Sequence, residues 1–101
     1  MTAADQPVAA ATRILVVDDI PDNVEILDAR LSSRGYIVDT ASDGEQALER
    51  IYVEPPHLVL LDVMMPKLDG FEVSRRIKSD PSLPFIPIIL VTALSEADDV
   101  V

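Results

Sequence analysis

The fold is decided first by an apolar run that ends in two acids, I-L-V-V-D-D at residues 14–19. Its apolar residues are continuous and do not alternate with polar ones, which is typical of a strand buried on both faces of a parallel sheet. Similar runs, rich in β-branched residues, follow at residues 36–38, 58–61 and 86–91. The sequence therefore predicts four buried strands along the chain.

Amphipathic patterns that predict helices separate these runs. In the first pattern, apolar side chains recur every three or four residues, and the helix is expected to end at Gly35, where a glycine cap would stop it. These apolar side chains are Ile20, Val24, Leu27 and Leu31. A second helix is expected to begin at Ser42, because Ser42 and Glu45 have the S-x-x-E spacing of a capping box. Its inner stripe is Ala47, Leu48 and Ile51.

Later helical patterns continue the alternation. One helix runs from about Gly70, with Phe71, Ser74 and Ile77 expected to face inward, and another begins at Ser95. Strands and helices that alternate in this way predict an α/β fold with a doubly wound parallel sheet. We assign residues 13–101 to this domain and residues 1–12, which show no apolar period, to a flexible N-terminal arm.

The composition of the 101-residue chain excludes several classes of protein. A net charge of −10 argues against binding to nucleic acid, which requires a basic surface. The absence of cysteine rules out disulfides and thiolate metal sites, and the single histidine, His57, cannot form a multi-histidine cluster. The apolar runs fall far short of the roughly 20 residues that cross a bilayer. We expect a cytoplasmic protein with no membrane association.

Acidic residues follow two of the predicted strands, at the point where each strand ends. Asp18 and Asp19 come directly after the first strand, and Asp62 follows the third. If these strands are neighbours, the carboxylates converge at the edge where ligands bind in open α/β sheets. Such a cluster of like charges favours a hard divalent cation such as Mg²⁺. A single aspartate here is also typical of a helix cap or a solvated turn, but the doubled acid and the matching Asp62 favour a metal site.

Three motifs together resemble those of response-regulator receiver domains. They are V-V-D-D at residues 16–19, L-V-L-L-D-V-M-M-P-K-L-D-G-F-E-V at residues 58–73 and L-V-T-A at residues 90–93. The resemblance implies a flavodoxin-like sheet with strand order 2-1-3-4-5. The sequence is also similar to receivers attached to diguanylate cyclases, although any such output enzyme would lie outside this chain, and no enzyme is expected within it.

The resemblance implies roles for individual residues. Asp62 matches the phosphoacceptor, a carboxylate nucleophile that forms an aspartyl phosphate. Asp18 and Asp19 match the acidic pair that holds Mg²⁺ or Mn²⁺, with Asp19 as a direct ligand and Asp18 acting partly through water. Met64 matches the position whose backbone carbonyl completes the metal's ligands, and Thr92 matches the hydroxyl that binds the phosphoryl group. The implied partner is a histidine kinase or a histidine phosphotransfer protein.

The sequence departs from the family after the fourth strand. Receivers continue with a fifth strand, which ends in a lysine that pairs with the phosphate, and with a fifth helix, whereas this sequence has no basic residue after Lys78 and stops at Val101. We therefore expect a receiver shortened within its fourth helix. The fourth strand or this last helix would then expose apolar surface, which predicts self-association.

Other functions are compatible with parts of the pattern. A receiver-like module that is not phosphorylated and only binds partners would account for the missing lysine. A metal-dependent phosphohydrolase would need D-x-D-x-[TV] after a strand, and neither Asp18-Asp19-Ile20 nor Asp62-Val63-Met64 fits. A Walker B strand would need a phosphate-binding loop, and no glycine here is followed by lysine. The phosphoacceptor function is therefore the leading hypothesis.

Overall fold

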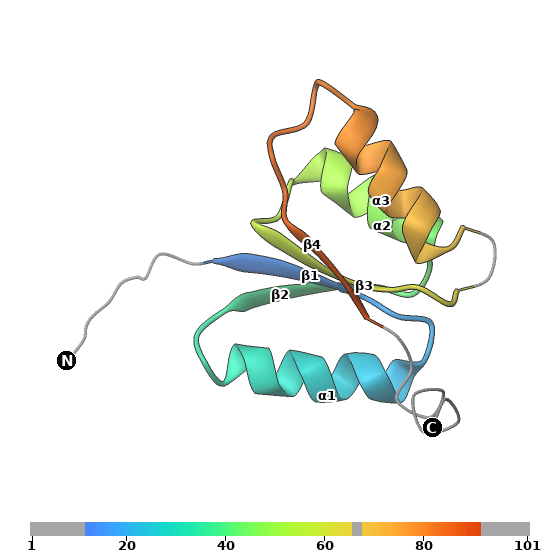
Figure 1. Cartoon of the computed structure of the whole chain (residues 1–101). Helices are drawn as coiled ribbons and strands as arrows, with labels where there is room; N and C mark the ends of the chain where they lie inside the picture. Colours follow the sequence, from blue (N-terminus) through green and yellow to red (C-terminus); the bar gives the residue numbers. More distant parts are fainter. Residues whose placement is uncertain (1–11, 66–67, 92–101) are drawn as a thin grey trace.

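The computed structural model describes residues 12–65 and 68–91 (Figure 1). Strands and helices alternate along them. In chain order they are β1 (Arg13–Val17), α1 (Pro21–Ser32), β2 (Ile37–Ala41), α2 (Gly44–Val53), β3 (Leu58–Asp62), α3 (Gly70–Ser79) and β4 (Ile88–Val91). All the strand pairs are parallel and the order across the sheet is β2-β1-β3-β4. The predicted doubly wound α/β sheet of flavodoxin-like order is confirmed.

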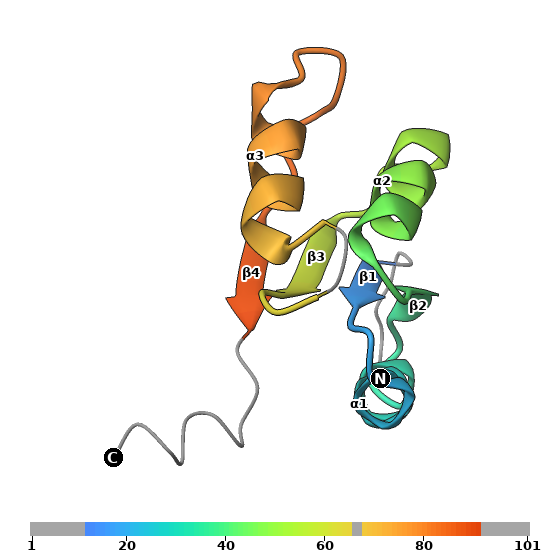
Figure 2. The same cartoon turned by 90° about the vertical axis from the view of Figure 1, so that its right-hand side faces the viewer.

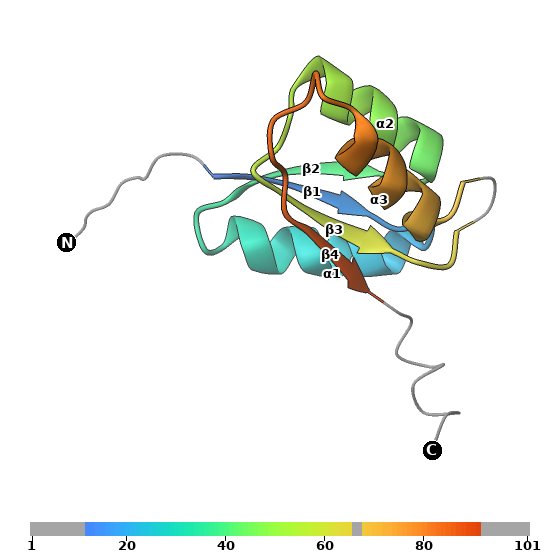
Figure 3. The same ribbon diagram turned by 45° about the horizontal axis from the view of Figure 1, so that its top comes forward.

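The helices divide between the two faces of the sheet. Helix α1 lies on one face, and α2 and α3 lie together on the other (Figure 2). Because the strands are parallel, their carboxyl ends point the same way and form a single edge of the sheet (Figure 3). The predicted arm and the predicted fourth helix fall outside the described residues, apart from Thr12, whose carbonyl accepts a hydrogen bond from the Ile37 N–H at 2.9 Å.

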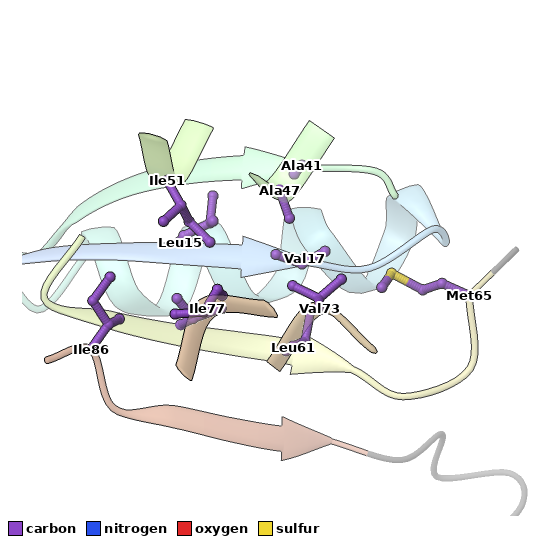
Figure 4. Close-up of a cluster of buried hydrophobic side chains, with 11 residues drawn as sticks. Leu15, Val17, Ala41, Ala47, Ile51, Leu61, Met65, Val73, Ile77 and Ile86 are labelled. Carbon is purple, nitrogen blue, oxygen red and sulfur yellow. The ribbon is translucent and has the colours of Figure 1, made fainter. Parts of the chain in front are cut away.

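The main core lies between the sheet and the pair α2 and α3 (Figure 4). Leu15 and Leu61 from the central strands are 1% exposed or less, and they share the cluster with Ile51 of α2 and Ile77 of α3. Burial of each such side chain contributes about 1.5–3 kcal/mol to folding. This packing fixes β1 and β3 rigidly, and these are the strands whose ends carry the predicted site.

Helix α1 is held less tightly than the other helices. It packs on β1 and β2, and none of its residues is fully buried. On the same side of the sheet, β4 presents Ile89, which is 51% exposed, and Val91, which is 39% exposed. The face opposite the main core is therefore only partly covered within the described residues.

One sequence prediction about a helix start needs correction, and one about a helix end is confirmed. Helix α2 is capped by Asp43 and not by Ser42, because the Asp43 carboxylate accepts from the Gln46 N–H at 2.8 Å while the Gln46 side chain accepts from the Ser42 N–H at 3.0 Å. The side chains of Asp43 and Gln46 thus satisfy the start of the helix in place of the predicted Ser42–Glu45 pair, and Asp43 places a charged acceptor at the positive end of the helix dipole. At the end of α1, Gly35 takes a left-handed φ of +94°. Its N–H donates to the Ser32 carbonyl at 3.0 Å and the Tyr36 N–H donates to the Leu31 carbonyl at 3.3 Å, so Gly35 forms the predicted glycine cap.

The predicted inner face of α3 is also partly wrong. Phe71 is 61% exposed, whereas Gly70, Val73 and Ile77 are buried. These buried residues are spaced by three and four positions and so form one stripe, and Phe71 falls beside that stripe. The strand limits differ too: β2 extends over Asp39 and Thr40, and β4 begins only after Pro87.

Candidate functional site

The predicted acids meet at the carboxyl edge of the sheet because β1 and β3 are direct neighbours. In their register Val17 lies opposite Leu61, so Asp18 and Asp62 follow side by side. The Asp18 N–H continues the strand pairing by donating to the Ala41 carbonyl at 3.1 Å. Rigid backbone on both sides therefore positions two of the three acids.

The carboxylates of Asp18, Asp19 and Asp62 form one cluster. Each contributes an oxygen atom, and these atoms all lie within 4.8 Å of one another. Asp18 and Asp62 are each only 8% exposed, whereas Asp19 is exposed. Two like charges about 4 Å apart repel by roughly 4 kcal/mol at an effective dielectric of 20, so a cation at this point would relieve a large repulsion. An all-oxygen donor set on the sheet edge fits a hard ion such as Mg²⁺.

Asp18 is held through both of its carboxylate oxygens. The Ile20 N–H donates to Oδ1 at 2.9 Å, and the side-chain amide of Asn23 donates to Oδ2 at 3.2 Å. Asn23 was not among the predicted site residues. The signal that could have found it is a polar side chain in the first turn of the helix that follows the paired acids.

Asp62 is connected to the loop that follows β3. The Met64 N–H donates to Asp62 Oδ1 at 3.3 Å, and the Met64 side chain is 59% exposed. The role of the Met64 carbonyl as a metal ligand stays a prediction. Thr92, the predicted switch hydroxyl, lies outside the described residues.

Two glycines set how closely this loop packs. The Gly70 N–H donates to the Val63 carbonyl at 3.1 Å, and a Cβ atom at Gly70 would overlap the carbonyl oxygen of Asp62. A Cβ atom at Gly44, the first residue of α2, would lie 2.5 Å from the Leu68 carbonyl oxygen. The sequence predicted the start of a helix at Gly70 but did not indicate that either glycine lies against the backbone of this loop.

An open groove of about 550 Å³ extends from the cluster along α1. Its charged lining residues are Asp18 and Asp19 of the cluster, Glu25 and Asp28 of α1, and Arg50 of α2. The charged side chains along this open approach to Asp18 and Asp19 are therefore mostly acidic. Among the described residues, no helix combines the length and the hydropathy that a membrane crossing would require.

Comparison with known proteins gives consistent matches along the chain. Residues 14–101 match the family model described as the response regulator receiver domain. Response regulator PleD of Caulobacter vibrioides is 49% identical over 89 residues, which cover 88% of this chain and 20% of PleD. The alkaline phosphatase synthesis transcriptional regulatory protein PhoP of Bacillus subtilis is 46% identical over 87 residues, 86% of this chain and 35% of PhoP. The chain thus spans about a fifth to a third of the length of these relatives.

Solved structures show the same fold. Response regulator protein TrrA from Thermotoga maritima, in complex with Mg²⁺-BeF, has a TM-score of 0.76 and 41% identity, with 87% of this chain and 75% of that chain covered. The N-terminal domain of a response regulator receiver protein from Methanoculleus marisnigri has a TM-score of 0.76 and 43% identity, with 86% and 74% covered. The sheet order, the acids at its carboxyl edge and these matches lead to one conclusion: the chain belongs to the response regulator receiver domain family.

Proposed function

We propose that this receiver domain accepts a phosphoryl group on Asp62 from a phosphohistidine of a histidine kinase or a histidine phosphotransfer protein, with Mg²⁺ bound at the acidic cluster. The observation that carries the proposal is the convergence of the Asp18, Asp19 and Asp62 carboxylates within 4.8 Å at the edge of the sheet. Asp19, Asp62 and the Met64 carbonyl would hold the ion, and Asp18 would assist. The Mg²⁺-BeF complex of the related TrrA supports this choice of ion.

The chemistry follows from the placement of Asp62. One carboxylate oxygen of Asp62 attacks phosphorus and forms the O–P bond, the P–N bond to the histidine breaks, and the imidazole leaves with the electron pair of that bond. The Met64 N–H, which donates to Asp62 Oδ1 at 3.3 Å, helps to orient the carboxylate for this attack. Bound Mg²⁺ supplies positive charge that offsets the charges of the carboxylate and the phosphoryl group. The Thr92 hydroxyl is proposed to bind the phosphoryl group.

Phosphorylation adds roughly 1.5 to 2 negative charges to a cluster that is already acidic. Those charges would change how the cluster attracts the surrounding loops. A change in loop position alters the surface offered to partners, and this is the proposed switch. The open groove beside α1 reaches Asp18 and Asp19 of the cluster.

The direct test is a reaction with a small phosphodonor, such as acetyl phosphate, followed by intact mass spectrometry. We expect addition of one phosphoryl group that depends on Mg²⁺ and is lost in Asp62→Asn. Asp28→Asn is the matched control, because it removes an acid from the same groove without removing one from the cluster. Labelling that persists in Asp62→Asn would contradict the assignment. A folded chain that binds Mg²⁺ but is never labelled would favour the alternative, an interaction module that is not phosphorylated.

We also propose that β4 forms a contact between two copies of the chain. Ile89, Leu90 and Val91 are 38–51% exposed, and β4 is the last strand in the order of the described sheet. Unpaired strand edges with aliphatic side chains favour pairing with another chain. The net charge of −10 opposes unlimited growth, so a dimer is the expected product.

A further inference from the structure

Asn23 lies in the first turn of α1 and faces the acidic cluster. Its side-chain Nδ2 donates to Asp18 Oδ2 at 3.2 Å, while the Ile20 N–H donates to Asp18 Oδ1 at 2.9 Å. Asp18 is 8% exposed, and Asn23 is half-buried. Neutral donors therefore hold both oxygens of a buried carboxylate. One donor is a backbone N–H, which any residue except proline supplies, whereas the other depends on the Asn23 side chain.

The needs of α1 itself do not explain an asparagine at this position. Inside a helix, asparagine is less favourable than alanine, because its side chain competes for backbone hydrogen bonds. Asparagine is preferred at the N-cap, yet the N-cap of α1 is Ile20, which makes no side-chain capping hydrogen bond. The Asn23 side chain instead reaches back to Asp18.

The charge of the amide also suits the cluster. A neutral amide can hold a carboxylate without changing the total charge that would attract a cation. Aspartate at this position would add repulsion to three converging acids, and lysine would neutralise Asp18 and compete with the cation. Hydrogen bonds to metal-binding carboxylates commonly fix their orientation and raise metal affinity.

We propose that Asn23 is a positioning residue of the Mg²⁺ site, acting through Asp18. The inference rests on the proposed function, since it requires that the cluster binds Mg²⁺. Asn23 and the Ile20 N–H keep the Asp18 carboxylate oriented toward Asp19 and Asp62 while occupying one direction of approach at each of its oxygens. Asp18 therefore assists from a fixed position, and Asp19 and Asp62 supply the direct ligands.

The test is a Mg²⁺ titration of the whole chain, followed by NMR. Asn23 is the chain's only asparagine, so comparing the spectra of the wild type and Asn23→Ala assigns its side-chain NH₂ signals and distinguishes them from those of the glutamines. These signals should shift as Mg²⁺ binds to the wild type. In Asn23→Ala, the Mg²⁺ dissociation constant should rise about tenfold, the low end of the usual effect of losing such a partner. The metal-free melting temperature should not fall in parallel, since alanine favours the helix.

Ser32→Ala is the matched control. The Ser32 hydroxyl also donates to an aspartate of α1, Asp28, at 2.8 Å, but at the opposite end of the helix. This variant loses the same kind of bond, and its Mg²⁺ affinity should equal that of the wild type. If Ser32→Ala weakens Mg²⁺ binding as much as Asn23→Ala does, the effect belongs to α1 as a whole and the inference is overturned.

A double-mutant cycle with Asp18→Asn tests whether Asn23 acts through Asp18. In the Asp18→Asn background, Asn23→Ala should change the Mg²⁺ dissociation constant by less than about twofold, because the partner it positions is already altered. A full tenfold loss in that background would overturn the inference. A wild type that does not bind Mg²⁺ would overturn the proposed function. Equal Mg²⁺ affinities of the wild type and of Asn23→Ala would overturn only the role of Asn23.

Discussion

Replacing Gly70 with alanine should weaken both the fold and the acidic site. Gly70 begins α3, and a Cβ atom there would overlap the Asp62 carbonyl oxygen and lie 3.0 Å from the Val63 Cα. Carbon atoms in normal contact are about 3.5 Å apart, so the end of β3 and the start of α3 must separate by at least about 0.5 Å. Overpacking of this kind costs about 1–3 kcal/mol of unfolding free energy.

The same displacement should weaken Mg²⁺ binding. Metal sites tolerate errors of only about 0.2 Å in their ligand distances, and the atoms that must move belong to Asp62 and to the residue that follows it. We therefore expect the Mg²⁺ dissociation constant of Gly70→Ala to rise about tenfold or more, a loss of about 1.4 kcal/mol of binding free energy. Thermal unfolding monitored by circular dichroism, with and without Mg²⁺, measures both quantities on one sample.

Gly35→Ala is the control for instability alone. Gly35 has a φ of +94° and nothing within 4 Å of the position of a Cβ atom, so alanine there strains the backbone without touching the site. That strain costs about 1–2 kcal/mol, similar to the loss expected for Gly70→Ala. Gly35→Ala should keep the Mg²⁺ affinity of the wild type. Equal Mg²⁺ affinities in the two variants, at similar losses of stability, would refute the reasoning about Gly70.

Other predictions follow from the same structure. Mg²⁺ should raise the melting temperature of the wild type by mass action, and much less so that of Asp19→Asn; an equal rise in both would remove Asp19 from the site. The hydrogen bond from the Tyr52 hydroxyl holds the pKa of Asp80 below its ordinary value of 3.8. The stability gained from this depressed pKa is present above pH 3.8 and is lost as the pH falls through the lower folded-state pKa. The unfolding free energy of Tyr52→Phe should therefore fall less steeply with acid in that range than that of the wild type. An unchanged dependence of stability on pH would contradict the contact. Light scattering over a concentration series should show dimers that Leu90→Lys disrupts, whereas a wild type that stays monomeric at high micromolar concentration would rule out the β4 contact.

The architecture could be predicted because it depends on patterns that are visible in the amino-acid sequence itself. Continuous apolar runs mark buried parallel strands, and the acids that end the first and third runs meet because those strands are neighbours. The strand order itself came from the family resemblance. The cluster of Asp18, Asp19 and Asp62 thus followed from the sequence together with the sheet topology.

The details that the sequence missed all depend on side-chain direction or on the close approach of two backbones. Asp43 caps α2 in place of Ser42 because its carboxylate reaches the Gln46 N–H, and both residues are acceptable caps by type. Phe71 is apolar but faces solvent because the stripe that contains Val73 is set by the angle at which α3 meets the sheet. The contact between Asn23 and Asp18 requires knowing where the loop before α1 turns.

The loose packing of α1 has a consequence for how the site responds to a cation. Helix α1 contains no fully buried residue, so its amides should exchange with solvent through local openings that cost far less free energy than global unfolding. Asp62, by contrast, ends a central strand whose Val59 and Leu61 are 0% exposed. The cluster therefore joins one half that opens easily, the exposed Asp19 with the turn leading into α1, to one half, Asp18 and Asp62, that opens only when the domain unfolds. A bound cation would link these two halves and so stabilise α1 against local opening. Slower amide hydrogen exchange along α1 would then show that the acidic cluster is occupied, even for amides far from the ion.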